Sequence, residues 1–103
     1  MRIINEPVVH KFHRKHPDSR RWLGEWLTVA RAAQWQTIQD LKQVYPAADG
    51  GVRAASGARV TVIDVGGNKY RMIADVNYMT QTVNVLELMT HSEYSRDRWK
   101  QRY

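Results

Sequence analysis

Cysteine is absent from this 103-residue chain, and long apolar runs are absent as well. Without cysteine there can be no disulfide framework and no thiolate metal site. No stretch approaches the ~18 consecutive apolar residues of a membrane span. The first residues, MRIINEPVVHKF, hold no apolar signal core and no small-residue cleavage site. We therefore expect a cytoplasmic protein that does not associate with membranes.

Acidic residues are also few relative to basic ones. Sixteen Lys and Arg stand against ten Asp and Glu, so the formal net charge is +6. Hydrophobic residues make up 43% and charged residues 25%, which is typical of a folded globular chain. The length predicts one domain, residues 1–103. Such a charge predicts a polyanion or an acidic protein as a partner, and the alternative is that it serves solubility alone.

The first half of the chain carries apolar positions at helical spacing. Residues 1–5 predict a short strand, and three helices are predicted at 7–17, 16–35 and 37–46. Asp18 or Ser19 is expected to cap the second helix. The tryptophans of this half are expected in the core, because Trp22 and Trp26 fall on an apolar helix stripe.

The second half changes to a period of two. Strands are predicted at 59–65, 69–79 and 82–90, joined by tight turns into an antiparallel meander. The breaker-rich segment before them, 46–58, is expected to be a mobile surface loop. The last residues form either a short basic helix or a loose tail. Helices followed by strands indicate an α+β fold.

Two cations interrupt the second predicted strand. Lys69 and Arg71 are two residues apart, so they are expected on one face with about 7 Å between their Cα atoms. The other face carries the alternating apolar residues that pack on the helices. Two such cations are suited to phosphate oxygens. The alternative is a solvated outer face with a salt bridge to Asp64 or Asp75.

A histidine and a tyrosine follow the third predicted strand. In a meander, that strand runs back toward the start of the second strand. His91 is therefore expected beside Lys69 and Arg71, with Tyr94 close by. The group would combine two phosphate-binding cations, a proton carrier, and a ring able to stack on a base or donate a hydrogen bond.

The blocks VGGNKYRMIADV and LMTHSEY, preceded by WQTIQDLKQVYPAAD, resemble the HigB toxin family of bacterial type II toxin–antitoxin modules. This family belongs to the RelE/ParE superfamily, and the resemblance covers nearly the whole chain. It implies a RelE-like α+β fold. In that fold, N-terminal helices pack on a small twisted antiparallel sheet, made of the three-stranded C-terminal meander plus a short N-terminal strand. It also implies an mRNA interferase that cuts translated messages in the ribosomal A site and is neutralised by a helix-turn-helix antitoxin of the HigA type.

The resemblance also implies roles for individual residues. The expected catalytic residues are Lys69, Arg71, His91 and Tyr94. The expected RNA-binding residues are Asn68, Lys69, Arg71, Arg96, Arg98 and Lys100. We expect neither a cofactor nor a metal, because proton transfer and charge stabilisation are assigned to side chains. Two positions depart from the family pattern, where Asp64 and Ser95 stand in place of Asn and Asp.

Two other function classes fit the same sequence. A ParE-like binder would poison a protein such as gyrase without cutting anything, and a non-cleaving module would bind RNA or the ribosome. His10, His13 and His16 recur every three residues, which allows either a metal site or a basic helix face against ribosomal RNA.

Overall fold

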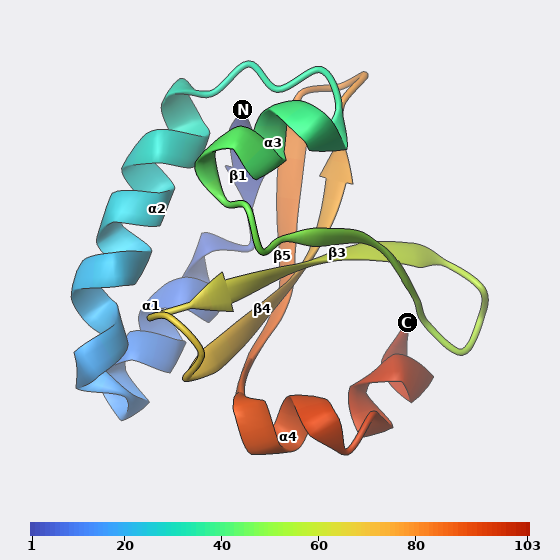
Figure 1. Cartoon of the computed structure of the whole chain (residues 1–103). Helices are drawn as coiled ribbons and strands as arrows, with labels where there is room; N and C mark the ends of the chain where they lie inside the picture. The colour runs from blue at the N-terminus through green and yellow to red at the C-terminus, as the bar shows by residue number, and fades with distance from the viewer.

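The computed structural model describes residues 1–103, and it has a helical layer, a sheet and a C-terminal segment (Figure 1). The helices are α1 (Glu6–Lys15), α2 (Arg20–Ala32), α3 (Ile38–Val44) and α4 (His91–Ser95). Two 3-10 helices are η1 (Pro17–Ser19) and η2 (Arg98–Arg102). The strands are β1 (Arg2–Ile4), β2 (Asp49–Arg53), β3 (Arg59–Val65), β4 (Tyr70–Asn77) and β5 (Thr82–Thr90). No helix is long and apolar enough to cross a membrane.

The five strands form one mixed sheet in the order β1-β5-β4-β3-β2. β2, β3, β4 and β5 pair antiparallel, which confirms the predicted meander and the α+β class. β1 pairs parallel to β5, so the predicted antiparallel sheet is in fact mixed at this one edge. No hairpin joins β1 to β5, and a parallel neighbour is therefore allowed.

The segment expected to be a mobile loop contains a strand. β2 pairs with β3 from Asp49 opposite Val62 to Arg53 opposite Arg59, with an irregularity in the register between Asp49 and Val52. Gly50 lies so close to α3 that an added Cβ would stand 2.8 Å from the Ile38 side chain. The glycine that suggested a loop therefore permits a close approach of strand and helix.

The helical layer covers one face of the sheet. A cluster of 17 buried residues joins α1, α2 and α3 to that face, and it includes Met72 and Ala74 of β4. Trp26 and Trp35 are buried in it and Trp22 packs against it, so the core assignment of these tryptophans is confirmed. The N-terminal ammonium completes the layer by donating to the Ala30 and Ala33 carbonyls at the end of α2.

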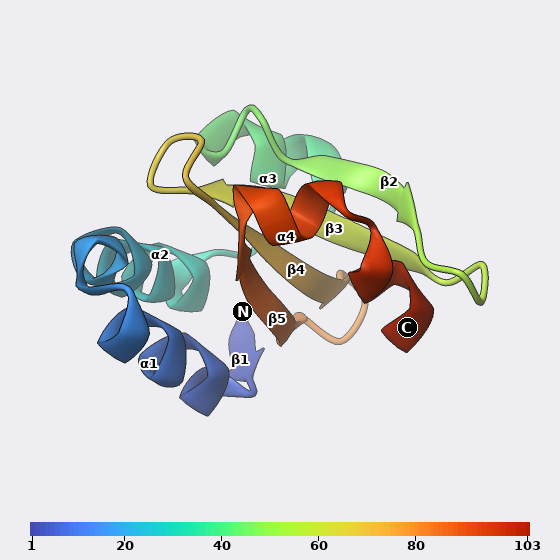
Figure 2. The ribbon, with the colours of Figure 1, turned by 90° about the horizontal axis from the view of Figure 1, so that it is seen from below.

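The other face of the sheet is covered by the C-terminal segment, α4 and η2 (Figure 2). Trp99 is 1% exposed and belongs to a second cluster with Val60, Val62, Ile73 and Met89. The tail is therefore ordered, and the alternative of a loose tail is wrong. The same cover buries Arg71 and Ile73, so the alternative of a solvated outer face is wrong for this part of β4.

Candidate active site

The turn between β3 and β4 carries the first group of predicted site residues. Gly66 has φ of 62° and Gly67 has φ of 74°, and this left-handed region favours glycine. The two glycines let the chain reverse over residues 66–69, which leaves Asn68 and Lys69 exposed at the end of the hairpin.

The junction of β5 and α4 carries the second group. Thr90 and Glu93 form a capping box, in which each side chain accepts a hydrogen bond from the other's backbone N–H at 3.1 Å. His91 opens α4, and its backbone N–H donates to the Lys69 carbonyl at 3.1 Å. The predicted proximity of His91 to Lys69 is confirmed. The His91 side chain is exposed.

Arg71 is buried, with only 8% of its surface exposed. Its Nε lies 3.2 Å from Asp64 Oδ1, which is the salt bridge that the alternative interpretation predicted. Its Nη1 donates to the carbonyl oxygens of Asn68 and Tyr70, and its Nη2 donates to Asn68 Oδ1. Its guanidinium carbon is 5.6 Å from the Tyr94 ring centroid. Arg71 therefore links the β3–β4 turn to α4 through these contacts.

Lys69 takes a different direction from Arg71. Its Nζ lies 3.0 Å from Asp18 Oδ2 in η1, and the Tyr70 hydroxyl donates to the other oxygen of Asp18 at 2.7 Å. Lys69 belongs to the turn and its ammonium meets the helical layer, so the expected shared face with Arg71 is wrong. The two cations reach opposite sides of the hairpin end.

Asp18 is the residue that sequence reasoning assigned incorrectly. Ser19, the other candidate, holds the N-cap position of α2, but no side chain makes a capping hydrogen bond there and the Ser19 hydroxyl donates to the His16 carbonyl. The hydrogen bond from Tyr70, followed by that from Lys69, holds the pKa of the Asp18 carboxyl below its ordinary value. The hydrogen bond between Tyr70 and Asp18 also raises the pKa of the Tyr70 phenol. No local pattern marks this contact, because it joins residues 51 positions apart.

Tyr94 is half-buried between the turn and the tail. Its ring stacks on Trp99 with 5.5 Å between centroids and 16° between planes. The Trp99 indole donates to the Tyr94 carbonyl at 3.2 Å. Burial raises the pKa of the Tyr94 phenol, so the hydroxyl stays neutral at physiological pH.

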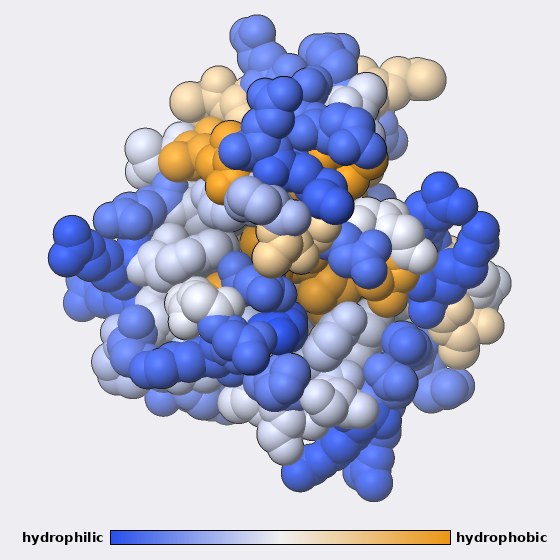
Figure 3. Space-filling view, viewed as in Figure 1, coloured by the Kyte–Doolittle hydropathy of each residue, from blue (hydrophilic) through white to orange (hydrophobic).

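The predicted basic residues of the tail divide into two kinds. Arg96 and Arg98 are exposed and line a hollow of about 180 Å³ together with Glu93. Lys100 is partly buried, with its Nζ 3.3 Å from Asp97 and 5.8 Å from the Trp99 ring centroid. The arginines are therefore the freer cations of the tail. Figure 3, viewed as Figure 1, shows a face of the molecule that is mostly hydrophilic with an apolar area near its middle.

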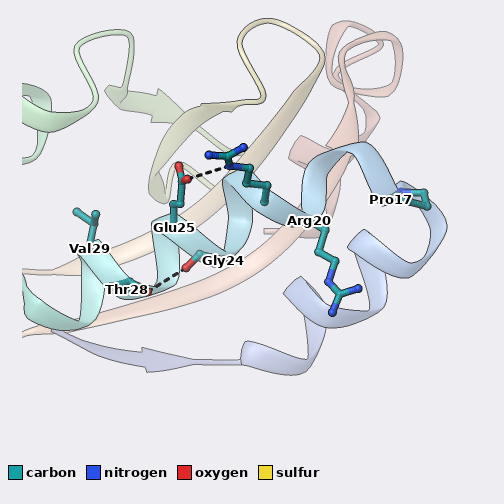
Figure 4. A pocket seen from close by; sticks show the side chains of 7 residues that line it. Pro17, Arg20, Gly24, Glu25, Thr28 and Val29 are labelled. Atoms are coloured by element: carbon teal, nitrogen blue, oxygen red, sulfur yellow. Dashed lines mark hydrogen bonds and ion pairs between the residues drawn. The ribbon is translucent and has the colours of Figure 1, made fainter.

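The largest hollow and the histidine pair His10 and His13 belong to other parts of the helical layer. The largest hollow, about 700 Å³, lies on the outer face of α2, where Arg21 pairs with Glu25 at 3.4 Å (Figure 4). On α1, His10 is hydrogen-bonded to His13 at 3.2 Å and to Glu6 at 2.8 Å. No three His, Asp or Glu side chains are arranged to hold a metal ion.

Comparisons with known proteins identify the family of this chain. Residues 19–97 match the family described as HigB toxin, RelE-like toxic component of a toxin–antitoxin system. The chain is also 26% identical over 96 residues to a protein of Escherichia coli O6:H1 named mRNA interferase HigB, covering 93% of this chain and 90% of that one. A family match over most of the chain, with helices packed on a mostly antiparallel sheet, settles the assignment. The chain belongs to the HigB toxin family, the RelE-like toxic components of toxin–antitoxin systems.

Proposed function

We propose that this toxin is a ribosome-dependent mRNA endonuclease. The observation that carries the proposal is the group at the end of the β3–β4 hairpin, where exposed His91 is hydrogen-bonded through its backbone to Lys69. A proton carrier and a cation thus stand together on an exposed surface of a basic chain. The name of the Escherichia coli relative, an mRNA interferase, describes the same chemistry.

The chemistry requires three tasks at the phosphodiester. A base takes the proton of the ribose 2′-OH, a cation neutralises the charge that builds on the phosphorane, and an acid protonates the leaving 5′-oxygen. We assign proton transfer to His91, as either base or acid. Lys69 stabilises charge, since its ion pair with Asp18 is exposed and easily exchanged for a phosphate.

Arg71 and Tyr94 act differently in this proposal. Most of the donors of Arg71 are already engaged by Asp64, Asn68 and Tyr70, so it supplies a fixed positive charge and holds the turn. Tyr94 contacts the RNA through its neutral hydroxyl or through the edge of its ring. These side chains cover the required tasks, and we propose that no metal takes part.

The bound message would continue over the tail. Arg96 and Arg98 offer free guanidinium groups, and we assign further contacts with the RNA to Asn68 and Lys100. RNA backbone contacts of this kind position the strand without reading its sequence. The cognate antitoxin, in our proposal a HigA-type helix-turn-helix protein, would keep the toxin from the ribosomal A site.

Mapping of new 5′ ends on messenger RNA tests the proposal. The toxin is expressed briefly in bacteria, with Lys69→Ala/His91→Ala as the matched inactive variant. We expect new ends inside translated frames for wild type alone. The single variant His91→Ala should cut at least about 10²-fold more slowly while keeping its fold.

Three other results would each contradict part of the proposal. Growth arrest with intact messages would favour a toxin that poisons a protein such as gyrase. Binding to ribosomes without any new ends would favour a non-cleaving module. Cuts by the double variant would place the chemistry elsewhere in the chain.

A further inference from the structure

A hollow of about 480 Å³ borders the other side of the β3–β4 turn. It lies between α2, the residues that follow α3, and the turn itself, and it contacts Asp64, Gly67 and Asn68. Small-ligand sites commonly have about 300–1,000 Å³. Because Asn68 precedes Lys69, the hollow adjoins the proposed cleavage group directly, with Cα atoms of these two residues ~3.8 Å apart.

Two aromatic side chains form one wall of the hollow. Trp22 and Tyr45 are partly exposed, and their ring centroids are 5.7 Å apart. Both rest on the main core, which fixes them against the helical layer. Burial, followed by the charge of Glu25, raises the pKa of Tyr45 to about 12, so the phenol is neutral at physiological pH. This wall is therefore aromatic and carries no negative charge.

Asp64 supplies a polar edge at the opposite wall. Its Oδ1 is held by Arg71 Nε at 3.2 Å, and its side chain remains 33% exposed. The guanidinium compensates the carboxylate charge, so a nearby phosphodiester is not strongly repelled. The other carboxylate oxygen is free to accept a hydrogen bond from an amino group in the hollow.

We propose that this hollow binds one unstacked nucleobase of the message, next to the cleaved phosphate. The inference rests on the proposed nuclease function and adds a base-binding subsite to it. Proteins that read single-stranded RNA combine aromatic stacking with hydrogen bonds to base edges. A carboxylate acceptor favours a base with an exocyclic amino group, so adenine, cytosine and guanine should bind better than uracil.

Titration with nucleoside monophosphates tests the subsite without requiring cleavage. AMP, CMP and UMP are added to the full-length His91→Ala protein, and the indole N–H resonance of Trp22 is followed by NMR. We expect AMP and CMP to shift that resonance, and UMP to bind more weakly. In the variants, AMP binding is followed through the backbone amide resonances of Gly67 and Asn68, which line the hollow. Trp22→Leu should weaken this binding about tenfold or more, and Trp22→Phe should restore most of it because the ring is kept.

Mapping of cut sites separates the subsite from the nuclease. With His91 intact, wild type should show a base preference beside the cut, and Trp22→Leu should still cut but lose that preference. An unshifted Trp22 resonance at millimolar AMP and CMP would overturn the subsite while leaving cleavage untouched. Base binding at Trp22 by a toxin that cuts no message would instead overturn the proposed nuclease and keep the hollow as a nucleotide site.

Discussion

Lys69 and Arg71 are two residues apart, yet they contribute to the molecule in different ways. Arg71 is buried and its guanidinium binds Asp64, the turn and the Tyr94 ring. Lys69 is exposed, with 66% of its side chain accessible, and its one ion pair joins it to η1. A loss of activity therefore has a different cause at each position.

Substitution of each cation separates stability from function. Arg71→Ala should lower the free energy of unfolding by about 3 kcal/mol, because Asp64 loses the partner of a largely buried ion pair. Lys69→Ala should change it by less than about 0.5 kcal/mol, as is usual for an exposed side chain. Urea denaturation measures both values. A stable Arg71→Ala protein would show that the turn is held without this guanidinium.

The contact of Asp18 with Tyr70 and Lys69 predicts a dependence on acid. Because the folded-state pKa of Asp18 lies below 3.8, the carboxylate stabilises the fold above about pH 3.8, and this contribution is lost as the pH falls through the lowered value. Asp18→Asn should therefore melt below wild type at pH 7, and the gap should be smaller near pH 3. Melting curves at the two pH values measure the gap. An equal gap at both would mean that the carboxylate charge is not involved.

At the scale of elements, strong local patterns could be recognised in the sequence. β3 and β5 have the predicted bounds, because their many β-branched residues indicate a strand without help from neighbours. β2 could not be predicted, since its DGGVR sequence becomes a strand only through its pairing with β3. The sequence also predicted that His91 lies beside Lys69, because in a meander the end of the third strand lies next to the start of the second.

The parts of the site that could not be predicted depend on contacts between distant segments. The burial of Arg71 follows from the tail folding over the sheet, with Trp99 at the centre of that cover. The direction of Lys69 follows from Asp18 in the helical layer. Period and composition indicate which face of a strand is apolar, but they do not reveal which distant residue meets a given cation.

α4 is a short element whose start positions His91. It has five residues, so its capping box contributes much of its stability. Thr90→Ala should lower the free energy of unfolding by about 1 kcal/mol and loosen α4, whereas Thr90→Ser should keep the cap. Hydrogen exchange of the α4 amides measures the local effect. Unchanged exchange in Thr90→Ala would show that Trp99 and the sheet hold α4 without its cap.

The charge of the whole molecule determines how RNA binding responds to salt. Each phosphate contact on a single strand contributes roughly 0.7 to the slope of log K against log salt. Because Arg96 and Arg98 are the free cations of the tail, Arg96→Ala/Arg98→Ala should reduce that slope by about 1.4. Arg20→Ala/Arg21→Ala removes the same charge from the outer face of α2 (Figure 4) and should leave the slope nearly unchanged.

This pair of variants distinguishes a defined RNA surface from general attraction. Both double variants lower the net charge from +6 to +4, so a response to net charge alone would be the same in each. The binding constant for a single-stranded oligonucleotide, measured by fluorescence anisotropy at several salt concentrations, gives the two slopes. Equal slopes would show that the message does not follow the tail, and that Lys69 and the hairpin end bind it by themselves.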